Sequence, residues 1–146
     1  MKTNINNQTL KAKKLLEEKG YTCVFIKGEK EIFSFERGVK PLLNFIDLGE
    51  DFSGFFVADK VVGKAASMLY ILLKIEEIFA EVISKPALEI LQKNGIKVFY
   101  KNKVERIENR TKDGFCPMEE AVLNCNSPKE SYFLIKEKLI FLQNKG

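Results

Sequence analysis

Apolar residues recur along this chain with two spacings, and these predict alternating helices and strands. Runs rich in β-branched and aromatic residues, TCVFIK and EIFSF on either side of a turn at 28–30, predict two strands joined as a hairpin. Apolar residues three and four positions apart between Val61 and Leu73 predict a helix with one buried face. In chain order, the pattern predicts a helix at 9–19, strands at 22–27 and 31–35, a short helix at 39–48, a strand at 54–58, a helix opening at 59, a strand at 78–83, a helix at 85–93, a strand at 96–100, a polar irregular stretch at 101–114 with room for a strand at 104–107, and helices at 117–123 and 128–143.

Residues that satisfy free backbone groups mark the expected helix ends. Thr9 is the expected N-cap of the first helix, and Gly20 follows its last turn. Ser84 precedes a helix with proline in its first turn, and Ser127–Glu130 is a capping box ahead of the last helix. Asp59 is the expected N-cap of the helix that opens there.

The order of these elements predicts a single α/β domain over residues 1–146. A hairpin followed by strand–helix alternation favours a mixed sheet, because right-handed crossovers join parallel neighbours. Helices would cover both faces of such a sheet, which makes a three-layer α-β-α sandwich. The 146 residues, 45% of them hydrophobic, suit one domain with its own core.

The absence of histidine and the few cysteines exclude several chemistries. Without His there is neither a His-based triad nor a His-containing zinc site. The three cysteines, Cys23, Cys116 and Cys125, form no CxxC pair, which argues against a disulfide framework and a cysteine-rich zinc site. We therefore expect no metal and no cofactor.

Charge and hydropathy restrict the partners. The 24 Lys and Arg residues exceed the 20 Asp and Glu residues by a net charge of +4. This mild excess, interleaved with acids, permits an anionic ligand without requiring a nucleic acid. The sequence shows no signal-like or membrane-spanning apolar segment, and we expect a cytoplasmic protein away from membranes.

Two segments carry a resemblance to a known family. VADKVVGKAA at 57–66 and SKPALEILQKNGI at 84–96 resemble paired segments of the formate dehydrogenase accessory sulfurtransferase family, where a D-K-x-x-G-x-A helix start precedes an S-x-x-x-x-E box. That family has the cytidine-deaminase-like fold, and the whole chain also resembles a small uncharacterised prokaryotic family assigned to it. The resemblance implies this fold and a nucleotide-like ligand.

The sequence departs from these relatives where their chemistry resides. Zinc deaminases place His or Cys and then Glu at the helix start that here reads Asp59-Lys60, and a P-C-x-x-C pair where this chain has Ala87 and Ile90. The working cysteine pair of the sulfurtransferase is missing too. The resemblance thus implies a zinc-free pocket where the two helix starts meet the strand ends, a place suited to phosphates.

Residues near the first helix start are candidate ligand contacts. Asp59 fits an N-cap, but also a general base or a contact to a ribose or base. Lys60 and Lys64 are four residues apart and would share a helical face. A lysine at a helix N-terminus is unfavourable by about 0.5 kcal/mol, which an anion bound nearby would offset. Gly63 inside a helix costs about 1 kcal/mol relative to Ala and indicates close packing or close approach of a ligand.

A second candidate group surrounds Cys116. Helix N–H dipoles would lower the pKa of a thiol at the start of the helix that follows, whereas Glu119 in the same turn would raise it. Arg110, in the preceding polar loop, can offset the acid or bind a charged group. An ordinary helix start explains the same residues. Without His, a base that assists Cys116 would be an acid such as Glu119, or a lysine.

Three functions remain open at this point. The first is a ligand-binding protein for a small anionic, nucleotide-derived molecule, in which the lysines neutralise phosphate, Asp59 contacts a sugar or base and Arg110 clamps a charged group. The second is a metal-independent enzyme with Cys116 as nucleophile and help from Glu119. The third is a noncatalytic interaction module that forms a homo-oligomer through a sheet edge or its last helix. The residues of the expected pocket are Asp59, Lys60, Lys64, Ser84, Arg110 and Cys116.

Overall fold

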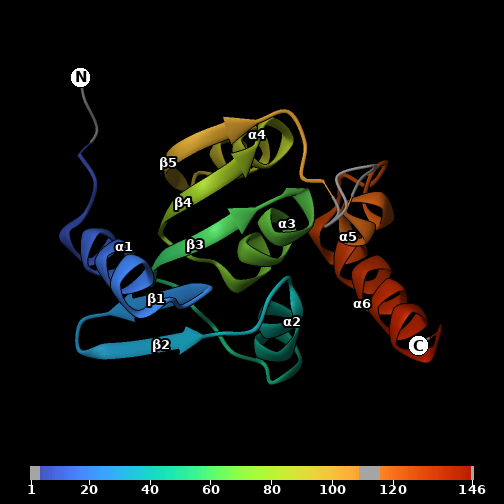
Figure 1. Ribbon diagram of the computed structural model, residues 1–146, viewed down its shortest axis with the longest axis horizontal. Coiled ribbons are helices and arrows are strands. Elements are labelled where there is room, and N and C mark those ends of the chain that lie inside the picture. Colours follow the sequence, from blue (N-terminus) through green and yellow to red (C-terminus); the bar gives the residue numbers. More distant parts are fainter. Residues whose placement is uncertain (1–3, 109–115, 146) are drawn as a thin grey trace.

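The computed structural model describes residues 4–108 and 116–145, and their helices and strands alternate largely as the sequence predicts (Figure 1). The elements in chain order are α1 (Asn7–Lys19), β1 (Cys23–Lys27), β2 (Lys30–Ser34), α2 (Lys40–Asp47), β3 (Phe56–Val62), α3 (Lys64–Leu73), β4 (Glu77–Ser84), α4 (Lys85–Lys93), β5 (Lys97–Val104), α5 (Pro117–Ala121) and α6 (Pro128–Lys145).

The five strands form one mixed sheet in the order β2-β1-β3-β4-β5. The hairpin pairs antiparallel, and β1 also runs antiparallel to β3. Strands β3, β4 and β5 are parallel, as expected for strands joined through helices. The predicted α/β class with a mixed sheet is therefore confirmed.

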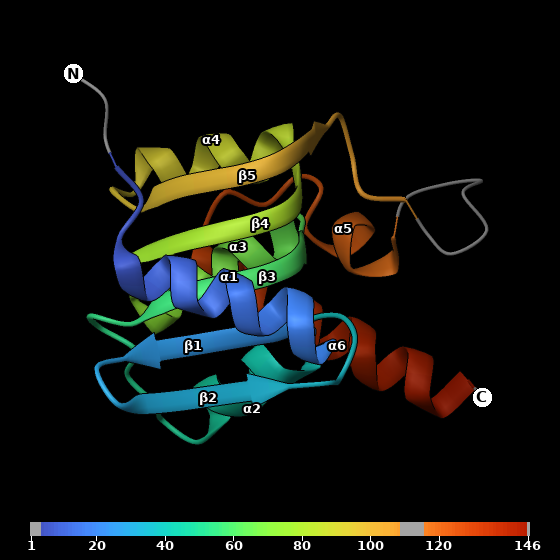
Figure 2. The same cartoon turned by 60° about the vertical axis from the view of Figure 1, so that its left-hand side comes forward.

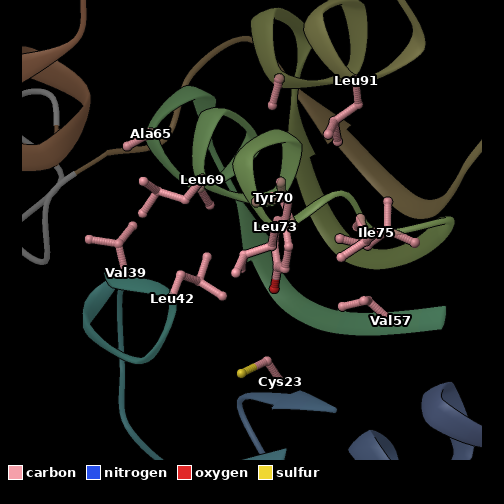
Figure 3. Close-up of a cluster of buried hydrophobic side chains, with 14 of the residues drawn as sticks. Cys23, Val39, Leu42, Val57, Ala65, Leu69, Tyr70, Leu73, Ile75 and Leu91 are labelled. Atoms are coloured by element: carbon pink, nitrogen blue, oxygen red, sulfur yellow. The ribbon is translucent and has the colours of Figure 1, made fainter. Parts of the chain in front are cut away.

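Helices lie on both faces of the sheet (Figure 2). Helix α1 covers one face, where Ala12 and Leu16 pack against Val24, Ile26 and Phe79. On the other face, α2, α3 and α4 bury a larger core that contains Phe25, Val57 and Leu69, among others (Figure 3). The alternation of Val24 and Ile26 with Phe25 between the two cores follows the two-residue period of a strand. These are the three layers of an α-β-α sandwich.

Several predicted boundaries are confirmed by local capping. Ser84 Oγ accepts the backbone N–H of Ala87 at 3.3 Å at the start of α4, and Ser127 Oγ accepts that of Glu130 at 3.2 Å at the start of α6. Gly20 ends α1 with a φ of 73°, a left-handed conformation that favours glycine. The N-cap of α1, however, is Asn6 and not Thr9.

The start of α3 corrects the sequence-based prediction. Asp59 does not open a helix, because β3 continues through it to Val62 and α3 begins at Lys64. Gly63 is the N-cap residue, with extended backbone, and so does not lie in a helix interior. The strand β5 likewise runs further than predicted, to Val104.

The carboxyl ends of the parallel strands define one rim of the sheet. Val62 on β3 is paired with Ile83 on β4, so the starts of α3 and α4 are neighbours at this rim. Because β1 is antiparallel, its first residue, Cys23, also lies there, opposite Asp59. Within residues 4–108 and 116–145, no helix is both long enough and apolar enough to cross a membrane.

Candidate functional site

A cavity of about 560 Å³ lies at this carboxyl rim. Its walls come from β1, the segment after β2, the β3–α3 junction, the residues after β5, and α5. The lining residues are Thr22, Cys23, Arg37, Gly38, Val39, Leu42, Asp59, Lys60, Val61, Gly63, Ala65, Ala66, Ile107, Glu108, Cys116, Pro117, Met118 and Glu119. Crevices outside the carboxyl ends of strands are where ligands bind in open α/β sheets.

Asp59 is a partly buried acid in the wall formed by β3. Its Oδ2 accepts the hydroxyl of Tyr70 at 2.5 Å, and its Oδ1 accepts the backbone N–H of Val61 at 3.2 Å. Burial raises the pKa of Asp59 to about 7, although these hydrogen bonds oppose the shift. Asp59 is therefore a carboxyl group whose protonation changes near neutral pH.

Two neighbours place Asp59 in a largely apolar setting. Tyr70 reaches from α3 toward the sheet and is fully buried (Figure 3). Burial raises the pKa of Tyr70 well above 10, so the phenol remains a hydrogen-bond donor to the carboxylate. Cys23 lies opposite Asp59 on β1, and burial raises the pKa of its thiol strongly. Cys23 is thus a neutral wall residue, not a thiolate.

Glu119 on α5 caps the start of α3 from a distant part of the chain. Its Oε1 accepts the backbone N–H of Lys64 at 2.7 Å, and its Oε2 accepts that of Ala65 at 2.7 Å. These are two of the helix N–H groups that have no partner within a helix, and a carboxylate there also complements the helix dipole. Burial nevertheless raises the pKa of Glu119.

Gly63 is required by this cap. A Cβ atom at position 63 would lie 2.4 Å from Oε1 of Glu119 and 2.9 Å from Cγ1 of Ile107. The glycine in the D-K-x-x-G-x-A segment therefore makes room for an acid of the chain itself. The sequence predicts close packing or a ligand here, and the structure shows close packing.

The structure brings together four of the predicted site residues. Asp59, Lys60, Cys116 and Glu119 all line the one cavity. Cys116 is half-buried and precedes α5, with its backbone N–H donated to the carbonyl oxygen of Ile107 at 3.2 Å. Glu119 already accepts two backbone N–H groups of α3.

The remaining predicted residues lie elsewhere. Lys64 donates from Nζ to the carbonyl oxygen of Leu123 at 3.1 Å, and the Ser84 hydroxyl caps α4. Lys60 and Lys64 do not share a helical face, because Lys60 belongs to β3. Lys60 therefore places no unfavourable positive charge at a helix N-terminus. Arg110 lies outside the described residues.

Sequence reasoning missed several cavity residues. Arg37 follows β2 and is exposed at the cavity, and Thr22 lies at the start of β1. Only strand pairing brings these segments to β3, so no local sequence signal points to them. The role of Tyr70 was also missed, since its hydroxyl is hidden within an otherwise apolar helix face.

Over the described part of the chain, no three His, Cys, Asp or Glu side chains are grouped so as to hold a metal ion. Ala87, near the start of α4, is fully buried and has no side-chain atom that can bind a metal.

Comparison with known proteins identifies the family. Residues 11–139 match the family profile described as a domain of unknown function, DUF1893. The chain belongs to the DUF1893 family. The crystal structure of a DUF1893 family protein, TM1506 from Thermotoga maritima, is 30% identical in sequence. Its match covers 93% of this chain and 92% of that one, with a TM-score of 0.85. No curated protein is significantly similar to this chain.

Proposed function

We propose that this protein is a zinc-free, cytidine-deaminase-like domain that binds a small anionic, nucleotide-derived ligand in the carboxyl-rim cavity. The observation that carries the proposal is the cavity itself: a partly buried Asp59 lies among apolar walls, with Arg37 and Lys60 on the same lining. Such a lining complements a ligand that has a flat, apolar ring, a polar edge on that ring and a negatively charged group.

The size and walls of the cavity suit a nucleotide. Ligand pockets have volumes of roughly 300–1,000 Å³, mostly apolar walls and a few convergent polar groups. The cavity has about 560 Å³, and Val39, Leu42, Ala66 and Met118 supply apolar surface. A base would lie against these side chains, with its hydrogen-bonding edge toward Asp59.

The cationic residues favour an anionic group on the ligand. Arg37 is exposed, so its guanidinium is available to bind a phosphate with two hydrogen bonds. Lys60 adds a second positive charge to the lining. The N-terminus of α3, which the sequence offers as a phosphate site, is not part of this proposal because Glu119 already accepts its N–H groups.

The strand order supports the cytidine-deaminase-like part of the proposal. The helix starts within the two resembling segments, at Lys64 and Lys85, are neighbours at one rim of the sheet. Ala87 and Ile90 lack any atom that can bind zinc, and so the residues present do not fit the zinc of the deaminases.

Isothermal titration calorimetry tests this function. We expect nucleoside monophosphates to bind, and the corresponding nucleosides and ribose 5-phosphate to bind more weakly. Arg37→Ala and Lys60→Ala should each weaken monophosphate binding about fivefold to tenfold, with a smaller effect on nucleosides. Lys97→Ala, an exposed lysine at the opposite rim, is the matched control. No binding by any of these compounds would refute the proposal.

A further inference from the structure

Two polar side chains in the cavity wall, those of Thr22 and Glu119, already have partners within the protein. The Thr22 hydroxyl lies 2.9 Å from the carbonyl oxygen of Ser34 and 2.6 Å from that of Glu36. Both carboxylate oxygens of Glu119 accept backbone N–H groups. The Thr22 hydroxyl thus joins β1 to the end of β2, and Glu119 joins α5 to the start of α3.

Asp59 differs from Glu119 in exposure, because Glu119 is buried whereas Asp59 is only partly buried and lines the cavity. An ionised carboxylate has about four lone-pair sites, two on each oxygen. Tyr70 uses one on Oδ2 and the N–H of Val61 uses one on Oδ1. The N–H of Lys60 donates to the carbonyl oxygen of Thr22 at 3.1 Å and also lowers the pKa of Asp59. Over residues 4–108 and 116–145, no lysine or arginine forms an ion pair with Asp59. Each oxygen thus keeps a site for one further donor.

The orientation of this carboxylate is fixed. The Tyr70 hydroxyl comes from a fully buried side chain on α3, and the Val61 N–H comes from the backbone of β3 itself. A carboxylate held on both oxygens presents its two remaining acceptors side by side. Such a pair matches two adjacent N–H donors on one ligand edge, in the way that carboxylates bind a guanidinium.

We infer that the cavity selects ligands whose base presents two adjacent N–H donors to Asp59, as guanine does with N1–H and its 2-amino group. This inference rests on the proposed function and names the ligand class for it. Hypoxanthine lacks one of the two donors. Adenine and cytosine each place a ring-nitrogen lone pair beside their amino group, and that lone pair would face the carboxylate.

Calorimetry at pH 8 with GMP, IMP, AMP and CMP tests the inference. We expect GMP to bind about tenfold or more tightly than each of the others, the discrimination typical of a paired hydrogen bond to a base. Asp59→Asn replaces one acceptor by a donor. This variant should lose the preference for GMP and gain affinity for XMP, whose base presents a donor beside an acceptor.

Two further variants keep the test interpretable. Glu89→Gln makes the same chemical change at an exposed position on α4 and should leave the preference for GMP intact. Tyr70→Phe keeps the buried ring but removes the hydroxyl that holds Oδ2, and it should reduce the ratio of GMP to IMP affinity. Circular dichroism and thermal unfolding establish whether each variant is folded. If Asp59→Asn is unfolded, the ratio of GMP to IMP affinity in Tyr70→Phe tests the inference.

The possible outcomes distinguish a failure of the selection by Asp59 from a failure of the proposed function. Equal affinity for all four monophosphates, or a preference for AMP or CMP, would overturn the selection by Asp59 and leave the nucleotide site standing. Failure of every nucleotide to bind would overturn the proposed function, and with it this inference. A preference for GMP that Asp59→Asn abolishes and Glu89→Gln retains would support both.

Discussion

A carboxyl group lies at each rim of the sheet, Glu77 at the amino rim and Asp59 at the carboxyl rim, and the two differ in their surroundings. At the amino rim, Glu77 is 2% exposed and its Oε2 accepts the Thr9 hydroxyl at 2.5 Å and the backbone N–H of Asn6 at 2.9 Å. At the carboxyl rim, Asp59 also accepts two donors, yet it lines a cavity. The difference lies in what covers each acid: the start of α1 closes over Glu77, whereas a hollow faces Asp59.

Glu119 shows that the contrast does not arise from the cavity alone. It lines the same hollow as Asp59, but it is buried, and its donors on α3 lie 55 and 54 residues away in sequence. Glu77 and Glu119 therefore connect distant segments of the fold, whereas Asp59 is only partly buried and accepts donors from Val61 and Tyr70, 2 and 11 residues away. Four predictions test this division.

The largest effect is expected from the ionisation of Asp59. Burial raises the pKa of its carboxyl from 3.8 to about 7, so the folded state binds the proton more tightly than the unfolded chain. Stability is then highest below pH 4 and falls as the pH rises toward 7, by up to about 4 kcal/mol from this group. Asp59→Asn should flatten the pH dependence of the free energy of unfolding, measured in urea between pH 4 and 8.

Other titratable and charged groups near Asp59 are the same in both proteins, so the comparison isolates this one acid. Glu119, whose pKa burial also raises, contributes a slope of the same sign to each. An unchanged slope in Asp59→Asn would contradict the prediction. The groups that share the cavity or contact Asp59 are Cys23, Arg37, Lys60, Tyr70, Glu108, Cys116 and Glu119.

Removal of the acid at the other rim should destabilise the fold without affecting the site. Glu77→Ala leaves the Thr9 hydroxyl and the Asn6 N–H without their acceptor, and we expect a loss of about 3 kcal/mol in the free energy of unfolding. The exposed neighbour Glu76 provides the matched control, because Glu76→Ala should change stability by no more than about 0.5 kcal/mol. Weaker nucleotide binding by a folded Glu77→Ala protein would argue against the division of roles.

The contact between Gly63 and Glu119 gives a smaller, coupled effect. Gly63→Ala places a methyl group against Glu119, which is fixed by two hydrogen bonds, and should cost about 2 kcal/mol. In a Glu119→Ala background the same substitution should cost less, because the carboxylate is gone. Denaturant unfolding of the two single variants and the double variant measures this coupling, and strictly additive losses would contradict it.

The smallest effect concerns ligand affinity and pH. If guanine donates two hydrogen bonds to ionised Asp59, a group with a pKa of about 7, GMP should bind about tenfold more weakly at pH 6 than at pH 8. Calorimetry at the two pH values tests this. The phosphate of GMP titrates in the same way when GMP binds to Asp59→Asn, so this variant is the control for the titration of the ligand. An equal pH effect in both proteins would assign the change to the phosphate.

Local signals in the sequence predict much of the fold. The hairpin, α4 and α6 are predicted because their turns and caps lie within a few residues of each other, as at Ser84 and Ser127. Local signals do not predict the start of α3, because Gly63 makes no side-chain cap and the backbone N–H of Lys64 is accepted by Glu119, 55 residues away. Asp59 resembles an N-cap in sequence, and only strand pairing shows that it belongs to β3.

The candidate site was predictable in part for the same reason. Asp59, Lys60, Cys116 and Glu119 could be named from residue type and local pattern, and the fold gathers them in one cavity. The separate role of each of these residues could not be predicted, because it depends on which donors reach each acid. Arg37 and Tyr70 reach the site through tertiary contacts that carry no local signature.

The long separation between Glu119 and α3 has a consequence for synthesis on the ribosome. The strands and α1–α4 are complete by Val104, but the first N–H groups of α3 obtain their acceptor only when residue 119 has emerged. A nascent chain shorter than this can form the sheet and yet lacks the α5 wall of the hollow. Vectorial folding thus allows the cavity end to mature only after the sheet and α1–α4 have been synthesised.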